Sequence, residues 1–246
     1  MTKKILVTGF PHCGTTLIRS LIGSCKNVYD QSLESVNPID YKVDMDYKFY
    51  VWKLPILPKE FMRFGFRSKP KTDLSDTIII PIIRNPWNVF HSLHQRSLKY
   101  NEFSVLDITQ PHSLPHYLKT AERVYEVFIE PIKNIYPIRY EDIFKDDFII
   151  LKKIFDLIGL EYDDTIFVNN FNKFKHNNVG YEESHIHSNN NEYRVWQINQ
   201  KINNKNHDNI IIPIEIQNQL LKCNIIDKLN FNNLDYYNFN PNEKLI

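Results

Sequence analysis

The chain has 246 residues, which is long enough for one α/β domain with a sizeable hydrophobic core. Hydrophobic residues make up 42% and charged residues 24%, and 30 basic side chains balance 29 acidic ones. This balance excludes a global field that would favour nucleic acid or a membrane surface. Any phosphate site must therefore be local.

The cysteines and the N-terminal residues bear on the compartment. Cys13, Cys25 and Cys223 are too few and too scattered for a disulfide framework or a cysteine-based zinc site, which predicts a reduced, intracellular setting. No signal-peptide core precedes the first apolar run, and no run of 18 apolar residues occurs. We therefore expect a cytoplasmic protein without a membrane anchor.

Short apolar runs alternate along the chain with segments of helical spacing. In chain order the predicted elements are a strand at Lys4–Thr8, a helix at Thr15–Ser24, a strand at Tyr47–Lys53, a strand at Ile78–Ile83, a helix at Trp87–Leu98, a helix at Leu114–Ile132, a strand at Ile135–Tyr140, a helix at Asp147–Ile158 ended by Gly159, and a helix at Pro213–Leu221. Such alternation predicts an α/β fold with a mostly parallel sheet covered on both faces.

Three segments add detail to this pattern. Ile78–Ile83 is almost entirely apolar and β-branched, which predicts a central strand. The helix that follows it has Trp87, Phe90, Leu93 and Leu98 as its predicted buried set. Phe61–Asp76 is basic and turn-rich, which predicts a surface loop, and Lys173–Asn191 is polar and Asn-rich, with a length that suggests a lid.

A phosphate-binding loop is predicted between the first strand and the first helix. The segment Gly9-x-x-x-x-Gly14-Thr15-Thr16 combines glycines, which let the backbone approach an anion, with a helix N-terminus and two hydroxyl donors. Nucleotide triphosphatases carry Lys directly after the second Gly, but Thr15 stands here, so binding of ATP with magnesium is disfavoured. A plain strand-to-helix turn is the structural alternative.

A second anion contact is predicted after the Ile78–Ile83 strand. Arg84 lies at the carboxyl end of that strand, where ligands of open α/β sheets bind, and its guanidinium is suited to phosphate. Ser92 follows two helical turns later and adds a hydroxyl. The structural alternative is that Arg84 pairs with an acid or a carbonyl.

These two segments together resemble the sulfotransferase family. Residues 11–16, Pro-His-Cys-Gly-Thr-Thr, resemble its 5′-phosphosulfate loop, which is usually Pro-Lys/Arg-Ser-Gly-Thr-Thr/Ser, and the spacing of Arg84 to Ser92 matches its 3′-phosphate site. Lys53-Leu-Pro55 is similar to a Lys-x-Pro segment of the tyrosylprotein and Golgi-type branches, and Arg139-Tyr-Glu-Asp142 to a late family segment.

The resemblance implies one P-loop-type three-layer domain over residues 1–246, with about five parallel strands flanked by helices. It also implies an enzyme that uses 3′-phosphoadenosine 5′-phosphosulfate and releases adenosine 3′,5′-bisphosphate. The donor would be bound by Pro11, His12, Cys13, Gly14, Thr15, Thr16, Arg84, Ser92 and, by a looser match, Arg194. The chemistry needs no metal, and we read His185 and His187 as incidental members of a polar loop.

The resemblance further suggests catalytic roles. Glu34 lies 20 residues after Gly14, near the position of a catalytic Glu in the tyrosylprotein branch, and Asp30 remains an alternative base. Lys53 is the candidate cation for the leaving phosphate and sulfuryl oxygens. His12 departs from the family Lys or Arg, although a neutral imidazole still donates one hydrogen bond, and a bound dianion would raise its pKa.

Cysteine, histidine and arginine side chains near the motifs also have predicted roles. Cys13, near a helix N-terminus, is a candidate reactive thiol. His91 is predicted on the helix surface, and His112 and His116 are second-choice acceptor contacts. We expect Arg139 to form a buried structural pair with the acids that follow it.

Two rival functions stay open from the sequence. One is a phosphate-loop kinase of small molecules, and the other is a non-catalytic nucleotide-binding protein in which His12 marks lost activity. The acceptor hydroxyl or amine of a sulfotransferase would belong to a carbohydrate, a tyrosyl peptide or a metabolite. We expect no nucleic-acid partner.

Overall fold

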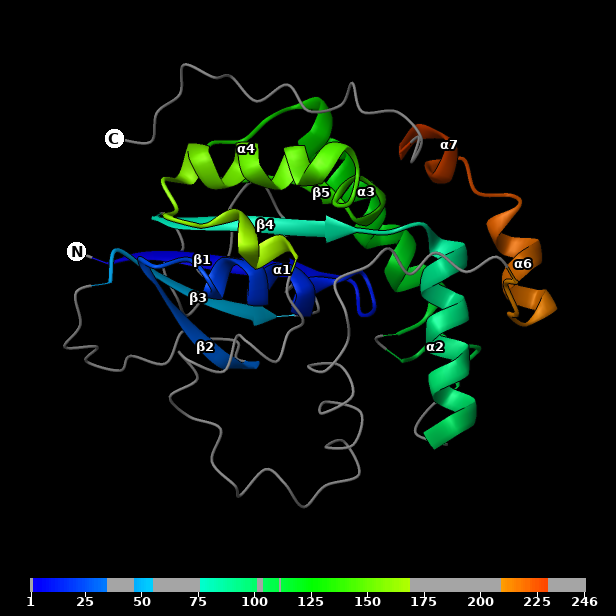
Figure 1. Cartoon of the computed structure of the whole chain (residues 1–246). Coiled ribbons are helices and arrows are strands. Elements are labelled where there is room, and N and C mark those ends of the chain that lie inside the picture. Colours follow the sequence, from blue (N-terminus) through cyan, green and yellow to red (C-terminus); the bar gives the residue numbers. More distant parts are fainter. Residues whose placement is uncertain are drawn as a thin grey trace.

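A five-stranded parallel sheet forms the centre of the structure (Figure 1). The computed structural model describes residues 2–34, 47–54, 76–100, 104–110, 112–168 and 209–229. The strands are β1 (Lys3–Gly9), β2 (Val28–Glu34), β3 (Phe49–Leu54), β4 (Thr77–Ile83) and β5 (Ile138–Arg139). They lie in the order β2-β3-β1-β4-β5, and every pair is parallel. The predicted α/β class and strand number are confirmed.

Helices flank this sheet and connect its strands. They are α1 (Thr15–Gly23), α2 (Pro86–Tyr100), α3 (Leu114–Ile129), α4 (Ile149–Ile158), α6 (Ile214–Leu220) and α7 (Ile225–Leu229), with short 3₁₀ turns η1 (Tyr140–Asp142), η2 (Asp146–Phe148) and η3 (Asp164–Phe167). Helix α1 packs against β1, β2 and β3, and α3 packs against β4. In the described part of the chain, no helix has the length and apolar character needed to cross a membrane.

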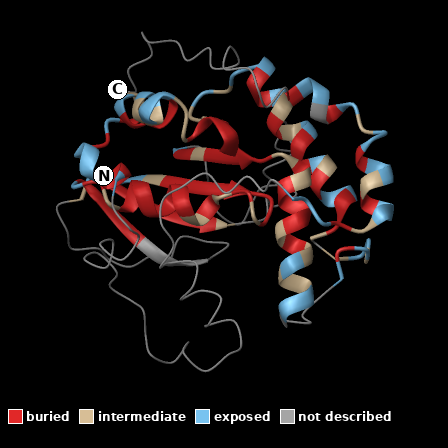
Figure 2. Cartoon of the chain, turned by 45° about the vertical axis from the view of Figure 1, so that its right-hand side comes forward, coloured by how far each residue is buried: buried red, intermediate tan, exposed pale blue. Residues whose placement is uncertain are grey.

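Strand β1 shows why the sheet is buried on both faces. Ile5 and Val7 join the main core cluster with the helices, whereas Leu6 points to the other face and packs with Tyr50 and Trp52. Figure 2 shows the central strands as buried almost throughout, while α2 and α3 alternate buried and exposed positions. A run of apolar residues without alternation is what a doubly covered parallel strand requires.

Two prolines shorten elements that the sequence predicted to be longer. Helix α3 ends at Ile129 rather than Ile132, because Pro131 disfavours helical geometry at the residue before it. Strand β5 contains only Ile138 and Arg139 rather than the predicted Ile135–Tyr140, and Ile135 makes an isolated bridge to Ile79. Pro137 has no N–H to donate to the ladder.

Helices α2 and α4 differ from two of the predictions. Leu98 was predicted to be buried on α2, but it is 66% exposed, whereas Phe90 and Leu93 are fully buried. Helix α4 begins at Ile149 rather than Asp147, because Asp147 and Phe148 adopt left-handed backbone angles. Gly159 ends α4 with φ 84°, as predicted.

Strand β2 was not predicted from the sequence. Its residues Val28–Glu34 include Asp30 and three further polar side chains and lack strand alternation. The strand forms by pairing with β3, and Asp30 is buried where its Oδ1 lies 3.5 Å from Nε of Arg19. This tertiary pairing overrides a weak local preference.

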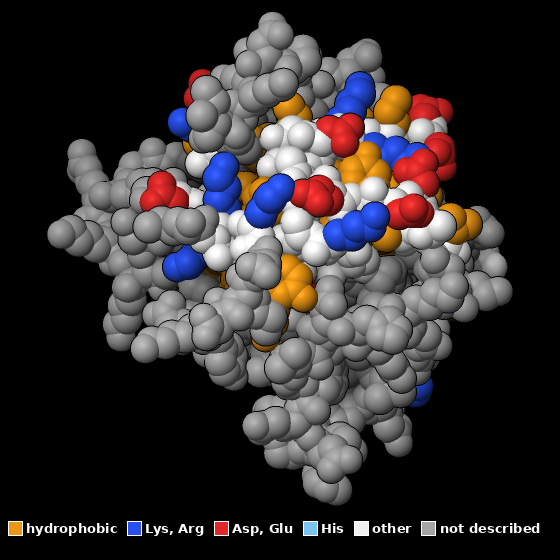
Figure 3. Space-filling model, turned by 60° about the vertical axis from the view of Figure 1, so that its left-hand side comes forward, with side chains coloured by type: hydrophobic (Ala, Val, Ile, Leu, Met, Phe, Trp, Pro, Cys, Tyr) orange, Lys and Arg blue, Asp and Glu red, His pale blue; other side chains and the backbone are white. Residues whose placement is uncertain are grey.

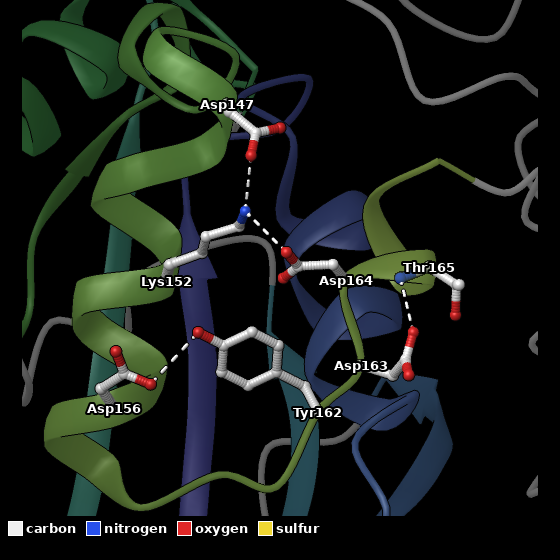
Figure 4. A network of polar contacts seen from close by, with 7 residues as sticks. All are labelled: Asp147, Lys152, Asp156, Tyr162, Asp163, Asp164 and Thr165. Atoms are coloured by element: carbon white, nitrogen blue, oxygen red, sulfur yellow. Dashed lines mark hydrogen bonds and ion pairs between the residues drawn. The ribbon is translucent and has the colours of Figure 1, made fainter.

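A surface network joins α4 to the segment that follows it (Figure 4). The Nζ of Lys152 lies 2.7 Å from Asp147 and 3.2 Å from Asp164, and Tyr162 donates its hydroxyl to Asp156. The carboxylates of Asp147 and Asp164 are largely exposed. Figure 3 shows acidic and basic side chains interspersed on one face of the molecule, which agrees with the balanced composition.

Two predicted loop segments fall almost entirely outside the part of the chain that the structure describes. Residues 61–75 of the basic, turn-rich segment and all of Lys173–Asn191 lie outside the described residues. The surface-loop and lid predictions therefore stay predictions.

Candidate functional site

Three neighbouring strands end at the same edge of the sheet and carry the predicted phosphate contacts. Strand β1 lies between β3 and β4, with Lys53 paired to Val7 and Ile82 paired to Gly9. The loop therefore starts next to Lys53 on one side and next to Arg84 on the other. Ligands of open parallel sheets bind at this carboxyl edge.

The two glycines of the loop are required by its geometry. Gly9 has φ 148°, and a Cβ at this position would lie 2.3 Å from the carbonyl oxygen of Ile82. Gly14 has φ 96°, and its Cβ would lie 2.5 Å from the ring of Tyr140. Gly14 also caps α1, and it has no side chain that could accept the first-turn N–H groups of the helix. This backbone suits an anion.

Lys53 reaches the loop from β3. Its Nζ donates to Oγ1 of Thr16 at 2.6 Å, and the residue is only 4% exposed. The ammonium group is therefore held at the start of α1 by its strand. A cation beside a helix N-terminus reinforces an anion site.

Arg84 is fixed from several sides. Its guanidinium carbon lies 4.2 Å from the ring centroid of Tyr140, and Nη1 donates to the carbonyl of His12 at 3.2 Å. The Tyr117 hydroxyl donates to the Arg84 carbonyl at 2.5 Å. Asn85 caps α2 by accepting the N–H of Trp87 at 3.0 Å, so the strand passes directly into the helix. Arg84 is positioned by these contacts at the loop.

His12 and Ser92 meet although 80 residues separate them. The Nδ1 of His12 and the Oγ of Ser92 lie 2.7 Å apart. Burial is the largest cause that lowers the pKa of His12 to about 3, and positive charges nearby add to the effect. These charges come from Arg96, His112, Arg84 and Lys53. The imidazole is therefore neutral at pH 7 and bonds to Ser92.

Cys13 is not the reactive thiol that the sequence suggested. The residue is fully buried, and burial raises the pKa of its thiol far above the ordinary value. Its backbone N–H donates to the Phe10 carbonyl at 3.2 Å. The positive charge of Arg84 and backbone hydrogen bonds lower this pKa, but the effect of burial outweighs them.

The two carboxylate candidates for the general base differ in what surrounds them. The backbone of Glu34 pairs with Lys53 at the end of β2, and its side chain lies outside the described residues. Asp30 is 3% exposed and faces Arg19, and burial raises its pKa. A Cβ on Gly23 would lie 2.7 Å from the Asp30 side chain, so Asp30 sits tightly under α1. These surroundings suit a structural ion pair.

The histidines occupy separate environments. His91 was predicted on the helix surface, but it is buried and accepts the N–H of Ile211 at Nδ1, at 2.9 Å. The chain segment that covers it is far away in sequence, which hides the contact from local patterns. His116 Nδ1 lies 2.8 Å from the hydroxyl of Ser113, at the start of α3. Arg194 lies outside the described residues.

Three residues near the site were not predicted to act there. Arg96 lies four residues after Ser92 on α2 and acts on His12 electrostatically. The helical spacing of Ser92 and Arg96 could have predicted that Arg96 lies near the site, because positions i and i+4 share a face of the helix. Tyr140 supports Arg84, and Glu141 accepts the N–H of Asn85 at 2.9 Å. No local signal connects these last two to Arg84.

The polar side chains after β5 include the predicted buried pair. Arg139 Nε donates to Asp142, both side chains are fully buried, and Arg139 Nη1 donates to the Leu229 carbonyl at 2.8 Å. This pair ties β5 to α7. Within the described ranges, no group of three His, Cys, Asp or Glu side chains could hold a metal ion.

Comparisons with known proteins support the fold. No family model matches the chain, and no curated protein matches it. The sulfotransferase domain of the Synechococcus PCC 7002 olefin synthase superposes with a TM-score of 0.56 at 12% identity, covering 93% of this chain and 94% of that one. The chain has a sulfotransferase-like fold. This agrees with the resemblance of residues 11–16 and 84–92.

Two further solved structures match with lower TM-scores. The sulfotransferase domain from the curacin biosynthetic pathway matches with a TM-score of 0.46 at 14% identity, over 68% of this chain and 77% of that one. Retinol dehydratase in a complex with retinol and PAP matches with a TM-score of 0.48 at 17% identity, over 94% of this chain and 82% of that one.

Proposed function

We propose that the chain is a sulfotransferase that moves a sulfuryl group from 3′-phosphoadenosine 5′-phosphosulfate to a hydroxyl or amine acceptor. The observation that carries this proposal is the meeting of the Gly9–Thr16 loop, Lys53 and Arg84 at three adjacent strand ends. The sulfotransferase-like fold supports it.

The loop and the two cations suit the two phosphate groups of this donor. The first turn of α1, with Thr15, Thr16 and Lys53, would hold the 5′-phosphosulfate. Arg84 and Ser92 would hold the 3′-phosphate, and Arg194 is proposed to join them. A guanidinium that lies over an aromatic ring and whose backbone carbonyl is hydrogen-bonded keeps its orientation for a tetrahedral anion.

In the transfer, a bond forms between the acceptor oxygen or nitrogen and sulfur while the bond from sulfur to the bridging oxygen breaks. The bridging oxygen leaves with the 5′-phosphate of adenosine 3′,5′-bisphosphate. Charge develops on that oxygen, and Lys53 would stabilise it. The acceptor proton would pass to Glu34, whose backbone pairs with Lys53.

A specific observation favours a second candidate, a nucleotide-binding protein without transfer activity. His12 stands where the family has Lys or Arg, and its pKa is lowered to about 3, so it brings no positive charge to the site. The Nδ1 of its ring is also hydrogen-bonded to the hydroxyl of Ser92. Lys53 would then be the main cation left at the sulfuryl end.

Two assays test the proposal. Competition binding should give adenosine 3′,5′-bisphosphate a clear preference over ATP with magnesium, whereas the opposite preference would indicate a kinase. Transfer of labelled sulfate from the donor to a panel of hydroxyl and amine acceptors should then give product. Activity that appears only in the His12→Lys variant would support the non-catalytic candidate for the natural chain.

A further inference from the structure

Glu141 is a buried carboxylate next to the predicted anion contact. Its Oε1 accepts the N–H of Asn85 at 2.9 Å, and Asn85 directly follows Arg84 and caps α2. The residue is 8% exposed, and Oε2 is buried without a hydrogen-bond partner among the described residues. One carboxylate oxygen is therefore satisfied by the backbone that carries Arg84, and the other is not.

The charges that face Glu141 come from several elements. Arg84, at the end of β4, favours the carboxylate, and Asp142 in the same 3₁₀ turn opposes it. Cys13 in the loop and Tyr117 on α3 also interact with it, but burial raises both of their pKa values, so both stay neutral. Burial is the largest cause that raises the pKa of Glu141 to about 7. Glu141 is thus near its midpoint at neutral pH.

We propose that Glu141 takes up a proton from solvent when the 3′-phosphate of the donor binds against Arg84, so that donor binding strengthens as the pH falls. This inference rests on the proposed function. The phosphate dianion repels the Glu141 carboxylate. It also pairs with the Arg84 guanidinium, whose positive charge otherwise favours that carboxylate. The proton adds to Oε2, which is otherwise unpartnered, and the bond from Asn85 to Oε1 is kept. Glu141 acts as a positioning residue that adjusts the charge of the site to its ligand.

The test is calorimetric binding of adenosine 3′,5′-bisphosphate to the full chain at pH 8, in buffers with different ionisation enthalpies. Both ligand phosphates are fully charged at this pH, so a proton taken up must go to the protein. We expect an uptake of between about 0.5 and 1 proton, and an affinity that falls about 3–10-fold per pH unit between pH 7 and 9.

A variant identifies the group that takes the proton. Glu141→Gln keeps an oxygen for the Asn85 N–H and imitates the protonated state, so it should bind without uptake and with an affinity nearly independent of pH. Glu122→Gln, at an exposed position on α3, is the matched control and should behave as wild type. The wild-type measurement stands by itself if Glu141→Gln does not fold.

Three outcomes would overturn the inference. Wild-type binding without proton uptake overturns it and leaves the proposed function intact. So does uptake that persists in Glu141→Gln and disappears in His12→Gln, because the proton then belongs to His12. If the wild-type chain binds the bisphosphate neither at pH 6 nor at pH 8, the proposed function is overturned, and the inference with it.

Discussion

The site around Arg84 and the network around Lys152 are both built from charged side chains, but they differ in burial. Arg84 is 5% exposed and is held by contacts from the loop, α3 and η1. Lys152 lies between two carboxylates that are 81% and 72% exposed (Figure 4). Buried polar groups are costly to disturb, whereas exposed ion pairs are screened by water. Substitutions at the first region should therefore matter far more.

The glycines offer the sharpest contrast. Gly9→Ala should lower the free energy of unfolding by more than about 3 kcal/mol, because it combines a disfavoured backbone angle with a clash against the Ile82 carbonyl. Gly159→Ala should cost only about 1 kcal/mol, because its angle is also left-handed but no atom lies within 4 Å of the added carbon. Denaturant unfolding measures both. Equal losses would contradict the loop geometry.

The pH dependence of stability is the next largest effect. The folded pKa of Glu141 is raised from 4.5 to about 7, so its stabilising contribution is complete below pH 4.5 and is lost as the pH rises through 7. Wild type should therefore lose about 3 kcal/mol relative to Glu141→Gln between pH 4.5 and pH 8. Chemical unfolding across this range checks it. A constant difference between the two proteins would show that Glu141 is not perturbed.

Arg84→Lys keeps the positive charge but removes the planar fork over Tyr140. We expect adenosine 3′,5′-bisphosphate to bind about 10–100-fold more weakly, because the bidentate, charge-assisted contacts are lost. Arg123→Lys, at a partly exposed position on α3 that pairs with Glu126, is the control and should bind like wild type. Titration calorimetry measures both. Unchanged binding in Arg84→Lys would remove Arg84 from the site.

The smallest effect is expected in the exposed network. Lys152→Met removes the bridge between Asp147 and Asp164 and should produce no resolvable change in stability or in bisphosphate binding. Parallel unfolding and binding curves test this. A loss as large as that of Arg84→Lys would show that burial does not separate the two regions.

The sequence predicted the elements whose own residues determine them. Strands β1 and β4 are apolar runs and the segment of β3 alternates, and the bounds of all three agree with prediction to within two residues. The glycines and the Arg84 to Ser92 spacing marked the loop and the second anion contact, because turn geometry and strand ends are local features. Prolines at positions 131 and 137 were present in the sequence, and their effect on α3 and β5 was underestimated.

The features that were missed depend on residues far apart in the chain. Strand β2 requires β3 beside it and Arg19 opposite Asp30. The contact of His12 with Ser92 and the position of Glu141 beside Asn85 arise only when the sheet brings the ends of β1, β4 and β5 together. The hydrophobic periodicity of a sequence does not indicate contacts between residues that are far apart in the chain. The same is true of His91, which Ile211 covers from the C-terminal part of the chain.

A crystal structure with adenosine 3′,5′-bisphosphate bound tests the central claim most directly. We predict that the 5′-phosphate lies on the N–H groups at the start of α1 near Lys53, and that the 3′-phosphate contacts Arg84 and Ser92. A nucleotide that binds elsewhere, or that contacts the loop without Arg84, would contradict the assignment of this sheet edge as the donor site.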